Sequence, residues 1–218
     1  MSTVQIPTFT PRHGGEREPD LTSMYVIHRA MLADLRRLTD LLARPGALGV
    51  ARTAAMRGYV SSLLVEIDHH HANEDDLLWP IIERTAGRAV DLSLFTDDHE
   101  ALEPLLRRCR EAVPGHPATL GAELTGLLAL LDAHIAEEES DLFPIVSRFV
   151  PYQAYAWVEK QVARRATVKE LTFTVPWLAR HATEPELDGL LAEAGLPFRV
   201  LLALTRGGFA RRERLLFG

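Results

Sequence analysis

The chain has 218 residues, of which 47% are hydrophobic and 25% charged, as in an ordinary soluble globular protein. Its net charge of −6 gives no electrostatic basis for nucleic-acid binding, and no nucleic-acid partner is expected. The single cysteine, Cys109, excludes an intrachain disulfide and is expected to be a small core residue. No apolar run resembles a signal peptide or reaches the roughly 18 residues of a membrane span, so we expect a cytoplasmic protein.

Residues 1–19 contain three prolines and mixed charge, and they predict a mobile N-terminal arm. Four segments follow in which apolar residues recur at steps of three and four, the spacing of amphipathic helices. These predicted helices cover about residues 21–42, 56–78, 92–113 and 120–142. Short connections favour an antiparallel up-down four-helix bundle over residues 20–150, and no alternating run predicts a strand. The expected fold class is therefore all-α.

Prolines mark the ends and bends of these helices. Pro45-Gly46 is expected to end the first helix, and Pro80 to kink or break the second. Pro104 lies inside the third and predicts a bend, whereas Pro144 repeats the position of Pro80 after the fourth.

Residues 151–218 predict a helical C-terminal extension. The apolar spacing indicates two short helices between Trp157 and Leu178 and a third over Glu184–Ala194, with Thr183 as its N-cap. The tail places four arginines among apolar residues, which is typical either of a basic amphipathic strip or of a segment that packs back on the bundle. Packing back is the favoured alternative.

One sequence pattern occurs twice, at residues 70–82 and 134–146. Each copy reads His-x-x-x-Glu and continues into Leu-aromatic-Pro-Ile and an aliphatic residue, with that Leu eight residues after the His. A His and a Glu four residues apart lie on one helix face, about 6 Å apart along the axis, within reach of one metal ion. Two copies with identical spacing indicate a shared constraint.

Each predicted bundle helix also carries one histidine on its apolar stripe, and two of them carry the glutamate of the repeat. An unpaired carboxylate in an apolar core is costly, and a pair of metal ions offsets that cost. The set has too few oxygens for calcium or magnesium and too many ligands for one tetrahedral zinc, but it suits iron or manganese. The predicted metal ligands are His28, His70, Glu74, His99, His134 and Glu138.

The economical arrangement of these ligands holds two metal ions. Each ion takes two imidazoles and shares both carboxylates. Positions then remain for solvent, for an oxo or hydroxo bridge, and for a small external ligand.

Several nearby polar residues are weaker candidates. Tyr25 could be a ligand or an outer donor, although core packing is favoured, and Glu66 could orient an imidazole. Glu103 forms a third His-x-x-x-Glu but lacks the following motif, so it is expected at the surface. His69 and His71 point about 100° to either side of His70, so at most one approaches the site. His181 in the extension is expected to be structural.

The histidines, the two His-x-x-x-Glu motifs and their Leu-aromatic-Pro continuations resemble the hemerythrin-like (HHE cation-binding) family over about residues 20–150. The resemblance implies a left-handed four-helix bundle with a non-haem di-iron site and no other cofactor. It implies that His28 and His70 serve one iron and that His99 and His134 serve the other. Glu74 and Glu138 would bridge the two irons, with manganese or zinc able to substitute for iron.

Two departures from the family's oxygen carriers shape the functional prediction. Those proteins have a further His one turn before the position of His99, where this chain has Phe95, and their last carboxylate corresponds to Glu139. Helical spacing favours Glu138, and the choice between Glu138 and Glu139 stays open. One imidazole fewer favours redox chemistry or sensing over reversible oxygen carriage.

Two functions follow from these predictions. The first is binding or turnover of dioxygen, hydrogen peroxide or nitric oxide, which includes catalase-like or oxygen- and nitric-oxide-reducing activity with an unidentified electron donor. The second is a redox or oxygen sensor whose extension, residues 151–218, contacts a protein partner. Iron storage ranks lower, because ferritin-like sites use Glu-x-x-His.

Overall fold

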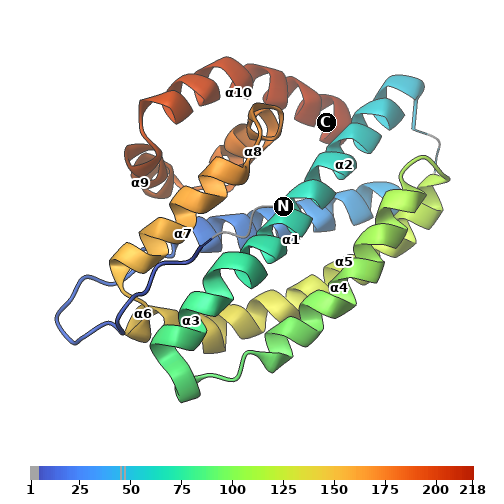
Figure 1. Ribbon diagram of the computed structural model, residues 1–218. Helices are drawn as coiled ribbons and strands as arrows, with labels where there is room; N and C mark the ends of the chain where they lie inside the picture. Colours follow the sequence, from blue (N-terminus) through green and yellow to red (C-terminus); the bar gives the residue numbers. More distant parts are fainter. Residues whose placement is uncertain (1–4, 45, 47) are drawn as a thin grey trace.

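The computed structural model describes residues 5–44, 46 and 48–218, and these residues form helices and no strands (Figure 1). Residues 1–4 of the predicted arm, and Pro45, lie outside the described residues. The α-helices are α1 Thr22–Ala43, α2 Val50–Asn73, α3 Trp79–Ala86, α4 Ser93–Ala112, α5 Pro117–Glu137, α6 Phe143–Phe149, α7 Tyr152–Arg165, α8 Val168–His181, α9 Glu184–Ala194 and α10 Leu196–Phe217. Two π-helical turns, η1 Glu74–Leu78 and η3 Glu138–Leu142, and a 3₁₀ turn, η2 Gly87–Ala89, complete the list.

The four long helices that carry the predicted ligands pack side by side around one apolar core. α1 contacts α5, α5 contacts α4, and α4 contacts α2, as Figure 1 shows. The apolar stripes of the sequence line this core, and Cys109 is completely buried in it, as predicted. The core thereby fixes which face of each helix points inward.

Both copies of the repeat continue as helix through their prolines. The N–H groups of Trp79 and Phe143 donate to the carbonyls of Glu74 and Glu138, five residues earlier, which is π-helical bonding. Pro80 and Pro144 then lie in the first turn of the next α-helix, where a missing N–H has no helical acceptor to satisfy. Pro80 therefore does not break the helical path, and the π-helical turn is how the chain accommodates it.

A second apolar cluster closes the end of the molecule next to these π-helical turns. It joins Leu77 and Leu78 of the first copy, Leu142 of the second, and Tyr155 of α7. The described part of the N-terminal segment lies against this end. The Arg12 N–H donates to the Phe149 carbonyl at 2.8 Å, and the Phe9 and Trp157 rings pack with centroids 6.3 Å apart.

The extension forms α7 to α10, including the predicted helix that begins after Thr183. The Thr183 side chain caps this helix by accepting the N–H of Glu186. α10 packs against α8 and α2, with Phe209 and Leu216 buried, so the tail packs back as favoured.

A buried carboxylate ties the extension to the long helices. Asp34 of α1 is completely buried and accepts hydrogen bonds from the Trp177 indole at 2.8 Å, from Arg37 at 2.8 Å and from the Tyr59 hydroxyl. His181 Nε2 lies 3.5 Å from the same carboxylate, which is a structural position. Burial alone would raise the pKa of Asp34, but hydrogen bonds from His181 and Tyr59 outweigh it and lower that pKa.

One helical run, Pro117–Phe149, is long and apolar enough to cross a membrane by length and composition, with a mean hydropathy of 1.2. This run differs from the expectation that no apolar segment of the chain is long enough to span a membrane. The run contains α5, which packs against α1 and α4. The core helices of folded domains can be equally long and apolar, so the composition of this run is weak evidence for a membrane span.

Candidate metal centre

Two groups of buried side chains meet between the long helices. The first group joins His28 of α1, His70 of α2, Glu74 of η1 and Glu138 of η3, whose donor atoms all lie within 4.8 Å of one another. His28 Nε2 and His70 Nε2 are 3.1 Å apart. Each of these four residues is at most 8% exposed.

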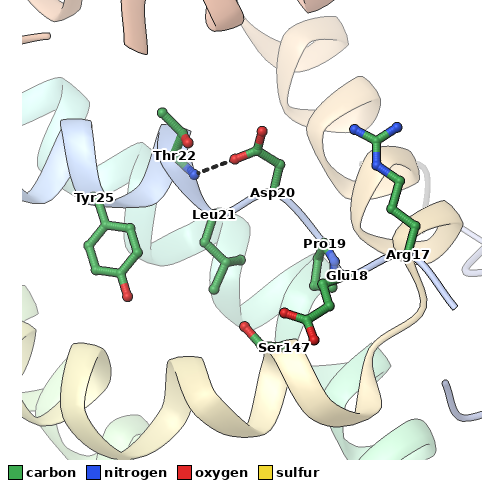
Figure 2. A pocket seen from close by; sticks show the side chains of 8 residues that line it. All are labelled: Arg17, Glu18, Pro19, Asp20, Leu21, Thr22, Tyr25 and Ser147. Atoms are coloured by element: carbon green, nitrogen blue, oxygen red, sulfur yellow. Dashed lines mark hydrogen bonds between the residues drawn. The ribbon is translucent and has the colours of Figure 1, made fainter. Parts of the chain in front are cut away.

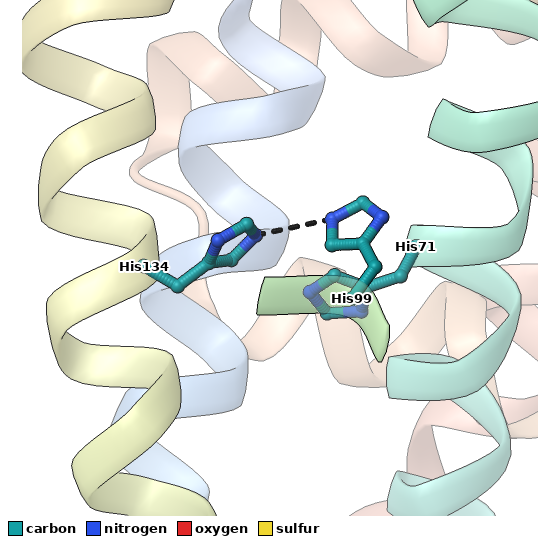
Figure 3. A group of neighbouring side chains, drawn as sticks. All are labelled: His71, His99 and His134. Atoms are coloured by element: carbon teal, nitrogen blue, oxygen red, sulfur yellow. Dashed lines mark hydrogen bonds between the residues drawn. The ribbon is translucent and has the colours of Figure 1, made fainter. Parts of the chain in front are cut away.

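The second group joins three imidazoles, from His71 of α2, His99 of α4 and His134 of α5, whose donor nitrogens also lie within 4.8 Å of one another. Figure 3 shows these rings converging from three different helices. His99 Nε2 and His134 Nε2 are 3.2 Å apart. All three side chains are buried.

The two glutamates connect the groups, because each directs one oxygen to either side. Glu74 Oε1 is 3.2 Å from His70 Nε2, and its Oε2 is 3.7 Å from His99 Nε2. Glu138 Oε2 is 3.5 Å from His28 Nε2, and its Oε1 is 3.4 Å from His134 Nε2. This is the arrangement needed for two carboxylates that each bridge two metal ions.

Outer carboxylates hold the imidazoles in orientation. His28 Nδ1 is 3.0 Å from Glu139, His99 Nδ1 is 2.8 Å from Asp75, and His134 Nδ1 is 3.1 Å from Asp98. When Nδ1 donates outward, the lone pair of Nε2 points inward and is free to bind a metal. Glu139 thus lies outside the group that Glu138 enters, and the alternative left open by the sequence has a geometric answer.

The inward-facing atoms also lack the partners that buried polar groups normally have. Both oxygens of Glu74, both oxygens of Glu138 and Nε2 of His71 are buried without a hydrogen bond within the described structure. Such orphaned atoms are rare in folded proteins, and here they fit an ion or another ligand that would satisfy them. The residues present therefore fit a metal pair.

Burial sets the protonation of the two groups. It raises the pKa of Glu138 to about 8, with Glu139 adding to the shift, and it raises the pKa of Glu74 well above the usual range, with Glu138 adding. Burial and neighbouring imidazoles lower the pKa of His70 strongly and that of His134 to about 4. Cations placed between these groups would reverse the cost of the carboxylate charges and would meet imidazoles that are already neutral.

The aromatic residues of the two repeats form walls of the site. The Phe143 ring stacks on His28 with centroids 5.5 Å apart, and the Trp79 ring stacks on His99 at 5.7 Å. Phe95 meets the His134 ring at 6.4 Å, so the residue that replaces a histidine adds an apolar wall. The repeat thus supplies both the donors and the dry surroundings in which they lie.

A surface cavity of about 540 Å³ lies one turn of α1 from His28. Figure 2 shows Tyr25 beside it, together with Asp20 and Thr22 at the start of the helix. Tyr25 is 42% exposed and packs edge-on against Phe143, so it is neither a ligand in this structure nor a core residue. Tyr25 thus lines the cavity and contacts the Phe143 ring that stacks on His28.

The remaining weaker candidates fall outside the two groups. The Glu66 carboxylate accepts a hydrogen bond from Thr174 Oγ1 at 2.6 Å instead of orienting an imidazole, and burial raises its pKa to about 7. Glu103 is exposed at the surface, as predicted, and His69 is also exposed.

His71 belongs to the second group although it was not one of the six predicted ligands. The motif contains His70, and the helical angle alone allowed His71 or His69 to approach the site. In the structure the His71 Nδ1 donates to the carbonyl of Ile67 at 2.6 Å, and this contact directs Nε2 into the second group. The run of three histidines, residues 69–71, indicates that a neighbour of His70 could also reach the site, but it does not show which one.

The six predicted ligands and His71 define an all-helical protein with buried His/Glu groups suited to metal binding. The Hemerythrin HHE cation binding domain model matches residues 21–146, more than half of the chain, and the chain belongs to this family. Neither a curated protein nor a solved structure matches it significantly. The matched residues cover both histidine groups and stop before α7, so the extension lies outside the family domain.

Proposed function

We propose that this protein holds two iron ions and binds or turns over a small oxidant, namely dioxygen, hydrogen peroxide or nitric oxide. The observation that carries the proposal is the pair of glutamates, each of which directs one orphaned oxygen to each imidazole group. Mixed nitrogen and oxygen ligation suits iron, and manganese or zinc are the expected substitutes. We further propose that the four long helices form an antiparallel up-down bundle and that the protein is cytoplasmic.

The donor count favours an open coordination position at one ion. His71, His99 and His134 would hold the second ion with three imidazoles, while His28 and His70 would supply two to the first. When bound, the ions would supply one-electron redox chemistry and vacant positions for the oxidant. The one imidazole that Phe95 removes from the expected set is thus replaced by His71 at the second ion, and the first ion has two imidazoles.

The protein's own groups would select and sequester the ligand. The Phe143 and Trp79 rings keep the site apolar, which admits small uncharged molecules and excludes hydrated ions. A surface cavity lies beside Tyr25, one turn of α1 from His28. Outer carboxylates such as Glu139 would increase the basicity of the ligating imidazoles and stabilise the oxidised ions.

The test is to load the metal-free protein with ferrous iron without air, to measure metal content, and to mix it with each oxidant in a stopped-flow spectrophotometer. We expect about two ions per chain and a spectral change with at least one oxidant. Glu103→Gln is the matched control for Glu138→Gln, because Glu103 also follows a histidine by four residues but its side chain is exposed. No change with any of the three oxidants would contradict the proposal.

The sensor function stays a prediction. The contacts of the extension with the long helices disfavour the movement that it requires. The extension is joined to α1 and α2 through the buried Asp34, with Trp177 and Tyr59 as donors. Moving it would expose this carboxylate or its partners, which is costly. A fixed support for the metal site fits these contacts better than a mobile arm does.

A further inference from the structure

A buried tyrosine of the extension lies at the carboxylate end of the metal site. Tyr155 of α7 is 3% exposed and packs with Leu77 and Leu78 of the first repeat. α7 contacts the π-helical turn that begins with Glu74. Burial raises the pKa of Tyr155, and the charges of Glu159 and Glu74 add to that shift. The packing of α7 therefore holds Tyr155 next to the turn that carries Glu74.

Polar contacts lead outward from this phenol. Tyr155 Oη is 3.4 Å from Ser23 Oγ, and the Ser23 hydroxyl donates to Glu159 Oε1 at 2.9 Å. While Glu159 is ionised, the single hydroxyl proton of Ser23 goes to Glu159, and the proton between Tyr155 and Ser23 then belongs to Tyr155. Ser23 lies in the family domain, whereas Tyr155 and Glu159 lie in the extension.

The outer end of this chain reaches a cavity of about 130 Å³, lined by Ser23 and Glu159 among others. Burial raises the pKa of Glu159 to about 7, the Ser23 hydrogen bond opposes this shift, and Glu193 and Asp20 add to it. Glu186 also lines the cavity, but it is paired with Arg29 at 2.7 Å. Near neutral pH, Glu159 can therefore both take a proton from solvent and release one.

We propose that Glu159, Ser23 and Tyr155 form a path that carries protons between this cavity and the metal site. The inference rests on the function proposed above. Reduction of one hydrogen peroxide to two waters consumes two protons and two electrons, and a ferrous ion pair held by the site would supply the electrons. The path supplies those protons one at a time.

Each transfer starts from protonated Glu159, and the three residues return to their starting states at the end of the cycle. The O–H bond of protonated Glu159 breaks as a bond forms on Ser23, Ser23 passes its own proton to Tyr155, and Tyr155 releases its proton to the substrate oxygen. The hydroxyl groups then rotate back, and Glu159 takes a new proton from the solvent in the cavity. Tyr155 and Ser23 donate and accept in turn, and Glu159 sets the pH range in which the path is filled.

The first test measures single-turnover oxidation of the ferrous-loaded protein by hydrogen peroxide against pH. In the wild type the rate should fall as the pH rises through about 7, and it should be slower in deuterated water. Tyr155→Phe, Ser23→Ala and Glu159→Gln should each slow the reaction at least about tenfold and weaken its pH dependence, since a positioned proton donor contributes this much or more.

Two matched variants serve as controls. Glu193→Gln alters a carboxylate of the same cavity that does not contact Ser23, and Tyr25→Phe alters a tyrosine beside His28. Tyr25→Phe should keep the wild-type rate and pH profile, whereas Glu193→Gln should keep the rate at low pH and move the midpoint of the profile slightly to lower pH, because the charge of Glu193 adds to the raised pKa of Glu159. Equal slowing in the controls, or wild-type behaviour in Tyr155→Phe and Ser23→Ala, would overturn the path.

The second test uses the metal-free protein and so does not depend on any reaction. Infrared difference spectra should show a protonated carboxyl band that is lost in Glu159→Gln, titrates near neutral pH, and shifts in Ser23→Ala and Tyr155→Phe. An unshifted band overturns the path. If the loaded wild type reacts with no oxidant, the proposed function fails, and the infrared shifts alone decide whether the three groups are connected.

Discussion

The two copies of the repeat, residues 70–82 and 134–146, build opposite sides of one site, and they differ in the number of imidazoles that they supply to it. In each copy the glutamate reaches both imidazole groups, and the acid that follows it, Asp75 or Glu139, contacts the histidine of a helix outside the repeats. In each copy the aromatic residue stacks on that same histidine.

The difference lies in the residue after the repeat histidine. In the first copy it is His71, which enters the second group, whereas in the second copy it is Ile135, which packs in the apolar core. The first copy therefore supplies imidazoles to both groups and the second to only one. The repeat sets a symmetric frame, and one adjacent residue makes the two ion positions unequal.

The largest expected effect breaks what the copies share. Glu74→Ala and Glu138→Ala should each lower the iron content from about two ions per chain to fewer than one, because each carboxylate faces both positions. Metal analysis of the purified, reloaded variants measures this. Glu103→Ala, at an exposed glutamate, should keep both ions. If either bridging variant retained two ions, the glutamates would not be shared ligands.

The next effect concerns stability without metal. The pKa of Glu138 is raised to about 8 in the folded protein, so between its unfolded value of 4.5 and 8 the folded state holds a proton that the unfolded state has lost. The free energy of unfolding should therefore fall as pH rises through this window. Glu138→Gln should remove this contribution and gain on the order of a few kcal/mol at pH 8.

Urea unfolding of the metal-free protein at several pH values measures this effect. Glu137→Gln is the matched control, because Glu137 is exposed on the preceding position of the same segment. Burial also lowers the pKa of His134 to about 4, so its contribution acts in the opposite direction, destabilising the fold as pH falls from 6.5 toward 4. A wild-type stability that did not decrease between pH 6.5 and 8 would contradict the assignment to Glu138.

The third effect makes the copies alike. His71→Ile gives the first copy the residue of the second, and it should weaken binding of one ion about 100-fold while leaving the other ion in place, since outer partners alone are worth 10- to 100-fold. Titration against a competing chelator separates the two binding steps. His69→Ile changes the exposed neighbour and should leave both steps unaltered. Equal weakening in both variants would indicate a general disturbance of α2.

His71 also shows how far the sequence could predict the site. The helices, their inward faces and the residues that meet at the site followed from periodicity and from the repeat, because a helix fixes the direction of every side chain on it. The choice between His69 and His71 did not follow, because both lie at a similar angle from His70 and the rotation of α2 against its neighbours decides between them. That rotation depends on packing between distant segments.

The prolines and the extension give the same lesson for the fold. Pro80 and Pro144 predicted a kink or break, and the chain instead inserts a π-helical turn that begins at each glutamate. The sequence correctly marked these prolines as positions where α-helical hydrogen bonding is interrupted. It did not predict that a π-helical turn would keep the helix continuous there. Three helices of the extension were predicted from their spacing and from the Thr183 cap, whereas α10 was not predicted as a helix. The attachment of the extension through Asp34 was not predicted either, because its donor Trp177 is 143 residues away in the chain.

The smallest expected effect compares the outer carboxylates of the two copies. Asp75→Asn and Glu139→Gln keep the shape of each side chain but remove the charge that orients His99 and His28. Each should weaken metal binding about tenfold, at the lower end for such partners, and the two variants should affect different ions. Chelator titration measures the affinities, and Asp141→Asn, at an exposed acid of the second copy, is the control. Asp75 contacts a histidine of the second group, and Glu139 contacts a histidine of the first. If both variants weakened the binding of the same ion, this assignment of one carboxylate to each ion would be wrong.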